Sequence, residues 1–107
     1  MKPRVVVVAL VLLLSGILLF TYGRSRISAH SSAHSATLKW VPVAGATSYN
    51  VYRGTVRGGP YRRIGIALNP TYVDTPLPSR AVFYYVVTSV RYQRESRYSQ
   101  EVKASIP

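Results

Sequence analysis

The sequence predicts an all-β domain, a sandwich or barrel of short strands, that follows one N-terminal transmembrane helix. From Ala36 onward, apolar and polar residues alternate with a period of two, and Gly- and Pro-containing turns separate the alternating runs. No helical period appears in that part of the chain. The run from Val5 to Tyr22, in contrast, contains no charged residue. These observations predict two very different segments within 107 residues.

The charge-free run from Val5 to Tyr22 is long enough for a membrane span. As a helix it would extend about 27 Å, close to the roughly 30 Å of a hydrocarbon core. A cleaved signal peptide usually has a shorter apolar core, about 7–15 residues. We therefore expect residues 1–23 to be an uncleaved signal anchor, with a cleaved signal peptide as the alternative. No cysteine follows the run, which excludes a lipoprotein anchor.

The flanks of this run give its orientation. Lys2 and Arg4 precede it, Arg24 and Arg26 follow it, and the free amino terminus adds one charge on the N-terminal side. The positive-inside rule then favours an N-terminus in the cytoplasm. We expect a single-pass protein of the cell membrane whose C-terminal domain lies outside the cytoplasm. If the run is cleaved, the protein is secreted instead.

Residues 24–35 (RSRISAHSSAHS) form the predicted linker. Ser, Ala and His dominate it and no apolar period is present. His30 and His34 are spaced four apart, but no carboxylate or cysteine lies near them, so we expect solvated linker histidines rather than a metal site. The chain has no cysteine at all, which removes thiolate metal sites, disulfides and thiol nucleophiles. No cofactor is expected.

The predicted domain occupies residues 36–107. Leu38 and Trp40 alternate in the first run, Tyr49 and Val51 in the second, and Ile64 and Ile66 flank Gly65 in the third. Runs rich in β-branched and aromatic residues follow at 70–75, 81–92 and 99–106. Turn residues fill the gaps at 43–47, 57–60, 69–70 and 75–79.

This domain resembles a fibronectin type III domain, an immunoglobulin-like β-sandwich, of the kind common in bacterial extracytoplasmic proteins. The resemblance rests on six stretches in order. ATLKW resembles strand B, PVAGATSYNVYR the B–C turn and strand C, GGPYRRI the turn into the next strand, TYVDTPL strand E and its corner, VFYYVVTSV strand F, and ESRYSQEVKASIP the F–G hairpin and strand G.

The resemblance also implies a set of core residues. In two places, however, the sequence departs from the family pattern. Strand A is poorly marked and would have to come from residues 26–31. Phe83 stands at the position of the corner tyrosine, so the hydroxyl that bonds back to the backbone in this fold is missing. The expected inward-facing residues are Leu38, Trp40, Tyr49, Val51, Ile64, Tyr72, Leu77, Phe83, Tyr85, Val87 and Val102.

The charge balance points to anionic partners. The chain has 14 Lys and Arg against 3 Asp and Glu, a net charge of +11. If the family topology holds, the hairpin after strand C and the F–G hairpin belong to one sheet and could present one basic surface. Arginine-rich codon usage and the ordinary polar trim of a sheet are the competing explanation. The expected surface consists of Arg53, Arg57, Arg62, Arg63, Arg91, Arg94 and Arg97 with Tyr52 and Tyr84.

Three functional hypotheses follow. The first is a non-catalytic, membrane-anchored module for interaction or spacing at the cell envelope. The second is a secreted module that binds polysaccharide or cell wall through the Arg/Tyr face. The third is an enzyme. It is not expected, because Asp74, Glu95 and Glu101 are the chain's only acidic side chains and form no recognisable catalytic pattern. Besides the membrane itself, the candidate partners are anionic envelope polysaccharide, lipid headgroups and another envelope protein; nucleic acid is not expected.

Overall fold

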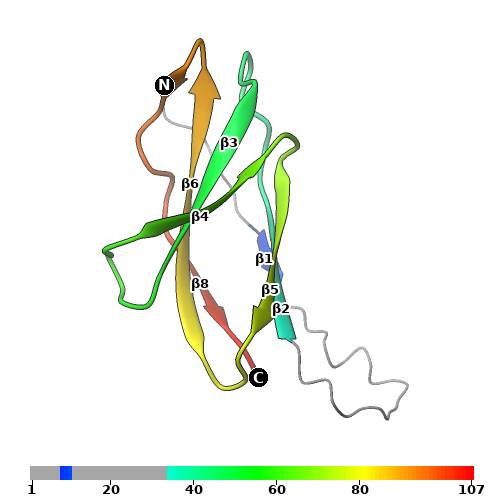
Figure 1. The fold of residues 1–107 in the computed structure, drawn as a ribbon, viewed down its shortest axis with the longest axis vertical. Helices are drawn as coiled ribbons and strands as arrows, with labels where there is room; N and C mark the ends of the chain where they lie inside the picture. Colours follow the sequence, from blue (N-terminus) through cyan, green and yellow to red (C-terminus); the bar gives the residue numbers. More distant parts are fainter. Residues whose placement is uncertain (1–7, 11–33) are drawn as a thin grey trace, which may run out of the picture.

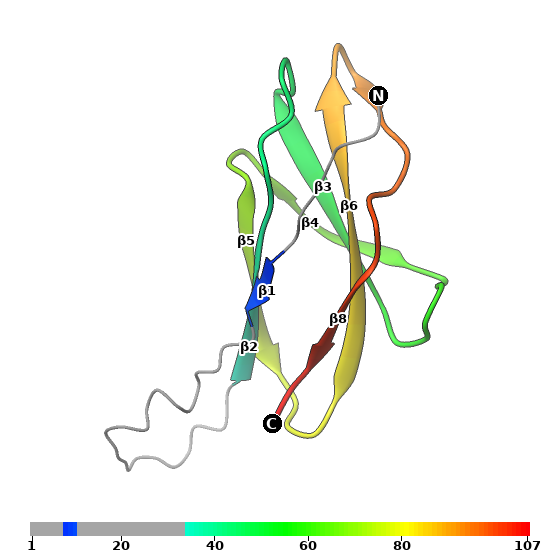
Figure 2. The same cartoon turned by 180° about the vertical axis from the view of Figure 1, so that it is seen from behind.

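A computed structural model describes residues 8–10 and 34–107. Within them the strands form two sheets that pack face to face (Figures 1 and 2). The smaller sheet has the order β1-β2-β5; the larger has β4-β3-β6, and both β7 and β8 pair with β6. The strands are β1 (Val8–Leu10), β2 (His34–Lys39), β3 (Ser48–Gly54), β4 (Arg62–Ala67), β5 (Thr71–Leu77), β6 (Val82–Arg91), β7 (Arg94–Glu95) and β8 (Val102–Ser105).

The pairing of β3 with β6 forms the centre of the larger sheet. Val51 lies opposite Val87 and Tyr49 opposite Ser89 in an antiparallel register. All four side chains are buried. The predicted inward alternation of Tyr49 and Val51 is therefore confirmed, as is the predicted sheet of strands C, F and G with the strand after C.

The core lies between the sheets around Trp40. Its indole meets the Tyr49 ring edge to face, with 5.3 Å between centroids and 72° between planes. The Tyr49 hydroxyl accepts a hydrogen bond of 2.9 Å from the Val43 amide, so this ring also fixes the turn before β3. Ile64 and Tyr72 pack against the core from a partly buried position, and Val102 is half-buried. The buried core residues are Ala36, Leu38, Trp40, Tyr49, Val51, Ala67, Leu77, Phe83, Tyr85, Val87, Ala104 and Ile106.

The N-terminal edge of the smaller sheet departs from the sequence prediction. Val8–Leu10 pairs antiparallel with β2, with Ala9 opposite Leu38. Helix was expected at these three residues; the structure has a strand there instead, because their backbone groups pair with the open edge of β2. The rest of the predicted membrane helix, and residues 26–31 predicted as strand A, lie outside the described residues.

The predicted linker ends earlier than expected. β2 takes in His34 and Ser35 and pairs His34 with Leu77. His34 is half-buried, and its buried Nδ1 has no hydrogen-bond partner among the described residues, so the prediction of a solvated linker histidine is wrong for His34. Residues 24–33 and His30 lie outside the described part.

A helix with the length and apolarity of a membrane span is not found within residues 8–10 and 34–107. A cluster of three or more potential metal ligands is likewise not found within those ranges.

Candidate functional site: the outer face and hairpin end of the larger sheet

The outer face of the larger sheet is organised around the Glu95 carboxylate. Asn50 and Thr88 lie opposite each other on β3 and β6, one residue out of phase with the core. Glu95 Oε2 accepts hydrogen bonds from Asn50 Nδ2 at 3.0 Å, from Thr88 Oγ1 at 2.6 Å and from the Tyr52 hydroxyl. The bond from Thr88, followed by that from Tyr52, lowers the pKa of Glu95 below its ordinary value. Glu95 is therefore ionised at neutral pH and held in place.

Three tyrosine rings contact one another in a row that begins with Tyr52, the tyrosine that donates to Glu95. Tyr98 stands between Tyr52 and Tyr61 and meets each edge to face, at centroid distances of 5.1 and 5.3 Å. The Tyr61 hydroxyl donates to Glu101, which also accepts a 2.7 Å bond from the Gly58 amide. Burial and the bonded carboxylates raise the pKa of Tyr52 and of Tyr61 to about 12. We call Tyr52, Tyr61 and Tyr98 the tyrosine cluster.

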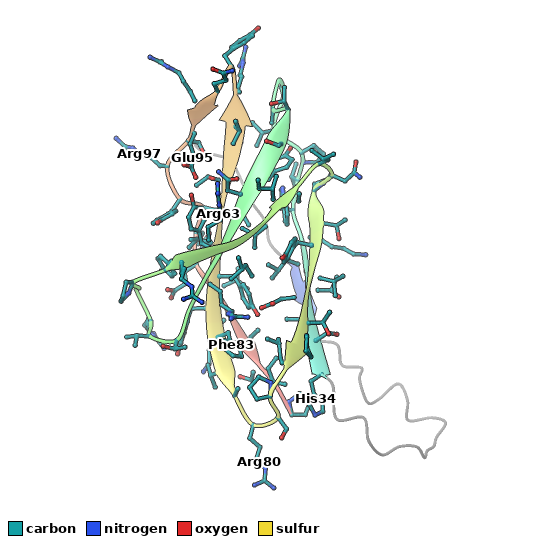
Figure 3. The ribbon with its side chains drawn as sticks, viewed as in Figure 1. His34, Arg63, Arg80, Phe83, Glu95 and Arg97 are labelled. Atoms are coloured by element: carbon teal, nitrogen blue, oxygen red, sulfur yellow. The ribbon has the colours of Figure 1, made fainter. Side chains whose placement is uncertain are left out.

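Two of the predicted arginines lie near this cluster. Arg63 is the register partner of Tyr52 on β4, and its charge contributes to the lowered pKa of Glu95. Figure 3 shows Arg63 and Glu95 over the same part of the larger sheet. Hydrogen bonds from the Tyr61 hydroxyl and then from the Gly58 amide lower the pKa of Glu101, and the charge of Arg57, on the loop between β3 and β4, adds to this effect.

Arg53 does not belong to the predicted surface. It continues the inward alternation of Tyr49 and Val51 along β3, and its Nη1 lies 3.1 and 2.9 Å from the two carboxylate oxygens of Asp74 on β5. Its guanidinium also stands 4.8 Å from the centre of the Phe83 ring. The prediction that Arg53 faces outward is wrong, because a buried carboxylate offers it a partner between the sheets. Asp74 itself lies within β5 and bonds the side chains of Arg53 and Tyr85.

The β6–β7 hairpin carries a second group of predicted arginines. Arg91 and Arg94 pair across a two-residue loop, Tyr92-Gln93, whose φ angles are 51° and 62°. The Arg91 guanidinium lies 5.3 Å from the centre of the Tyr92 ring. A pocket of about 370 Å³ opens here, between the hairpin and the turn before β3.

The predicted basic surface is thus divided. Tyr52 and Arg63 come together on the outer face, while Arg91 and Arg94 lie at the hairpin end. Tyr84 is on the outer side of β6 beside Lys103 of β8. Arg62 and Arg97 are exposed, and Arg97 projects into solvent in Figure 3.

Sequence reasoning did not assign roles to Glu95 and Glu101. Their importance comes from pairings across the sheet that depend on the position of the β6–β7 turn. Tyr92-Gln93 carries no turn signature, so that position could not be fixed from composition. One feature of the sequence could have indicated their roles. The whole chain has only three acidic side chains, so each of them was a candidate hydrogen-bond acceptor.

Comparison with known proteins identifies the family. A solved structure of an Fn3-like protein from Clostridium thermocellum is 38% identical, with a TM-score of 0.66, over 72% of this chain and 81% of that one. The chain belongs to the Fn3-like, fibronectin type III family. The predicted fold is therefore confirmed for the β-sandwich. No family model matches the chain.

Two further relatives place Fn3-like sequence of this kind within larger enzymes. An amylopullulanase of Thermoanaerobacter thermohydrosulfuricus is 39% identical over 80 residues, which are 73% of this Fn3-like chain and 5% of the enzyme. A β-1,2-glucanase of Parabacteroides distasonis has a structure that is 28% identical with a TM-score of 0.62, over 67% of this chain and 11% of the glucanase. The Fn3-like chain thus spans only a small part of each of these two enzymes.

Proposed function

We propose that this Fn3-like chain is a non-catalytic module that acts at the cell envelope and binds acidic polysaccharide there. The observation that carries the proposal is that the carboxylates of the domain already have bonding partners within it. Asp74 is bonded to Arg53 and Tyr85, while Glu95 and Glu101 accept hydrogen bonds from tyrosines and backbone or amide donors. The described residues contain one ion pair, Arg53–Asp74. The other arginines of the domain carry charge that no acidic side chain pairs with at close range.

A surface of unpaired arginines beside tyrosines suits an anionic, hydroxyl-rich polymer. Arginine binds carboxylates and phosphates through a planar fork of N–H donors, and tyrosine offers both an apolar ring and a polar tip. The relatives named amylopullulanase and β-1,2-glucanase support a glycan setting for the module. Because those names describe whole enzymes, they support polysaccharide as the class of polymer, whereas its acidic character is argued from the unpaired arginines alone.

The anchor is the second part of the proposal. Val5 to Tyr22 would hold the domain at the outer side of the membrane. Val8–Leu10 cannot lie in the bilayer and pair with β2 at the same time. A three-residue edge strand contributes few hydrogen bonds, of about 0.5–1.5 kcal/mol each. Burying the whole apolar run in lipid yields about 0.3–0.6 kcal/mol for each Leu, Ile, Val or Phe, so the membrane should prevail.

Two measurements test these parts separately. For the anchor, intact mass is measured on the chain from membrane and soluble fractions of its host after alkaline carbonate extraction. Full-length chain retained in the membrane supports the anchor, whereas a soluble chain that begins near residue 30 or 34 contradicts it and favours a secreted module.

For the polymer, affinity electrophoresis of the full-length chain in detergent compares polygalacturonate with pullulan. We expect retardation by polygalacturonate that weakens with added salt, because exposed charges are screened over about 8–10 Å. Arg63→Gln and Tyr84→Ala should each reduce it more than Arg80→Gln, a charge on the turn between β5 and β6. A chain that neither polymer retards is a spacer, and that result would overturn the proposal.

A further inference from the structure

The pocket at the β6–β7 hairpin has features of a specific site. The turn before β3 and the β6–β7 hairpin lie at the same end of the sandwich (Figures 1 and 2). The pocket opens between these two segments. Its volume of about 370 Å³ is within the roughly 300–1,000 Å³ of small-ligand pockets. Its walls come from three segments: Val43 and Ala44; Ser89, Arg91 and Tyr92; and Arg94, Glu95 and Ser96.

Arg91 is held in a defined position in this pocket. A Cβ placed on Gly45 would come within 2.9 Å of Arg91 Nε, so the guanidinium lies directly against the Gly45 backbone. Gly45 has φ of +83°, a conformation that favours glycine in any case. The guanidinium also lies 5.3 Å from the centre of the Tyr92 ring. The position of the Arg91 charge is therefore set by packing.

The charges of the pocket are not balanced. No carboxylate oxygen of the described residues lies within 4 Å of a nitrogen of Arg91 or Arg94. Glu95 contributes to the wall, but its Oε2 is directed to Asn50, Tyr52 and Thr88 on the outer face. Two guanidinium groups against one carboxylate leave the pocket positively charged.

Tyr92 occupies its position at a conformational cost. The loop Tyr92-Gln93 has positive φ at both residues, the geometry of a type I′ turn, which strongly prefers Asn-Gly. A residue other than glycine or asparagine is disfavoured in this region, because its Cβ crowds the carbonyl oxygen that follows. Tyr92 is 81% exposed, so burial does not offset that cost. A strained, exposed aromatic residue beside two unpaired arginines is what a ligand site requires rather than what stability requires.

We propose that this pocket binds a hexuronic acid unit of an acidic polysaccharide. Arg91 and Arg94 hold the carboxylate through charge-assisted hydrogen bonds, and the Tyr92 ring packs against the C–H face of the sugar. The inference rests on the proposed polysaccharide function and narrows it to one sugar class and one site.

The test uses the full-length chain in detergent, titrated with trigalacturonate and followed by two-dimensional NMR of backbone amides. Carboxyl-reduced trigalacturonate and inorganic phosphate serve as comparison probes. We expect saturable shifts at the hairpin and at residues 43–45 with trigalacturonate, and at least tenfold weaker binding of both comparison probes. Phosphate that binds equally well would overturn the sugar assignment, and shifts confined to other surfaces would overturn the site.

Variants separate the pocket from general charge. Arg94→Gln and Arg91→Lys should each weaken trigalacturonate binding at least tenfold, since the first removes a charge and the second removes the planar fork. Tyr92→Asn should weaken binding while raising Tm, because asparagine tolerates positive φ, so lost binding could not be ascribed to unfolding. Arg80→Gln is the matched control and should leave binding unchanged. An equal loss with Arg80→Gln would overturn the proposal in favour of diffuse charge.

The two proposals fail in distinguishable ways. Polygalacturonate that still retards the chain, combined with trigalacturonate that does not bind the pocket, rejects this inference and leaves the proposed function standing. An absence of binding to any acidic polymer rejects both.

Discussion

Arg53 and Asp74 form an ion pair that joins the two sheets from inside the sandwich, with 2.9 Å between Nη1 and Oδ2. Arg53 comes from β3 in the larger sheet and Asp74 from β5 in the smaller one. The Tyr85 hydroxyl donates a 2.6 Å hydrogen bond to the same carboxylate oxygen. The side chains of Arg53 and Asp74 are 27% and 9% exposed, so this is a largely desolvated contact.

Removal of Arg53 should destabilise the domain strongly. Breaking a buried ion pair typically costs about 3–5 kcal/mol, because the remaining charge is left uncompensated. Since Arg53 retains some exposure, we expect Arg53→Ala to lose about 3 kcal/mol of unfolding free energy in urea titrations of the full-length chain. Arg97→Ala, on an exposed residue, should change it by less than about 0.5 kcal/mol. Equal effects of the two substitutions would contradict the structural role of the pair.

The Arg53 pair shows how far the sequence determines this fold. The alternation Tyr49, Val51, Arg53 follows from the period of two, and the first two members are inward as predicted. The third is also inward, but its charge favoured an exposed position in the absence of a visible partner. Asp74 is distant in sequence, and only the packing of the two sheets brings it opposite Arg53. Periodicity predicts on which face of a strand a side chain lies. Its partner in the other sheet can be identified only from the tertiary structure.

The candidate site was less predictable than the core for a related reason. Trp40, Leu77 and Val87 are apolar, and their burial follows from the hydrophobic effect together with strand period. Glu95 acts through hydrogen bonds to three strand residues, and these depend on the register of the β6–β7 hairpin. A Tyr-Gln pair is disfavoured in a turn of this type, so turn propensities do not predict a turn at this position. The sequence therefore predicted that Arg and Tyr would occupy the outer face, but it did not predict how they are arranged there.

Loss of the Trp40 ring should unfold most of the domain. The indole fills the centre of the core and contacts Tyr49. Trp→Ala substitutions in cores cost about 3–5 kcal/mol, and the stability of a small domain is often only about 5 kcal/mol. Amide dispersion in NMR spectra of Trp40→Ala should collapse, whereas Val41→Ala, on an exposed neighbour, should retain it. A cooperatively folded Trp40→Ala domain would contradict the place of Trp40 at the centre of the core.

The Glu95 carboxylate should make stability depend on pH in the acidic range. Its folded-state pKa is lowered, so its contribution is fully present above the unfolded value of about 4.3 and is lost as pH falls through the folded value. We therefore expect the Tm of the wild-type chain to fall between about pH 5 and pH 3 more steeply than the Tm of Glu95→Gln. Arg97→Gln should keep the wild-type slope. Parallel curves of Tm against pH for wild type and Glu95→Gln would show that the hydrogen bonds from Thr88 and Tyr52 contribute nothing to the pH dependence of stability.

The raised pKa values of Tyr52 and Tyr61 should appear in alkaline titration. An unperturbed tyrosine ionises near pH 10, whereas burial and the bonded carboxylates raise these two pKa values to about 12. Their neutral forms stabilise the folded state below pH 10, and that contribution is lost as pH rises toward 12. Absorbance at 295 nm should show a late-titrating component that Tyr52→Phe and Tyr61→Phe each diminish. Titration of all tyrosines near pH 10 in the folded protein would contradict the hydrogen bonds to Glu95 and Glu101.

Phe83→Tyr should stabilise the domain. Phe83 stands near the start of β6 and is buried in the core cluster, and the Arg53 guanidinium lies 4.8 Å from the centre of its ring. Tyrosine at this position would keep both the ring and its contact with the cation, and would add the hydroxyl that bonds to the backbone in related folds. One such bond contributes about 0.5–1.5 kcal/mol, which should raise Tm by several degrees. Tyr84→Phe, the opposite exchange at the adjacent outward-facing position, should have little effect. An unchanged or lower Tm for Phe83→Tyr would mean that the corner of this domain has repacked around phenylalanine and no longer accepts a hydroxyl.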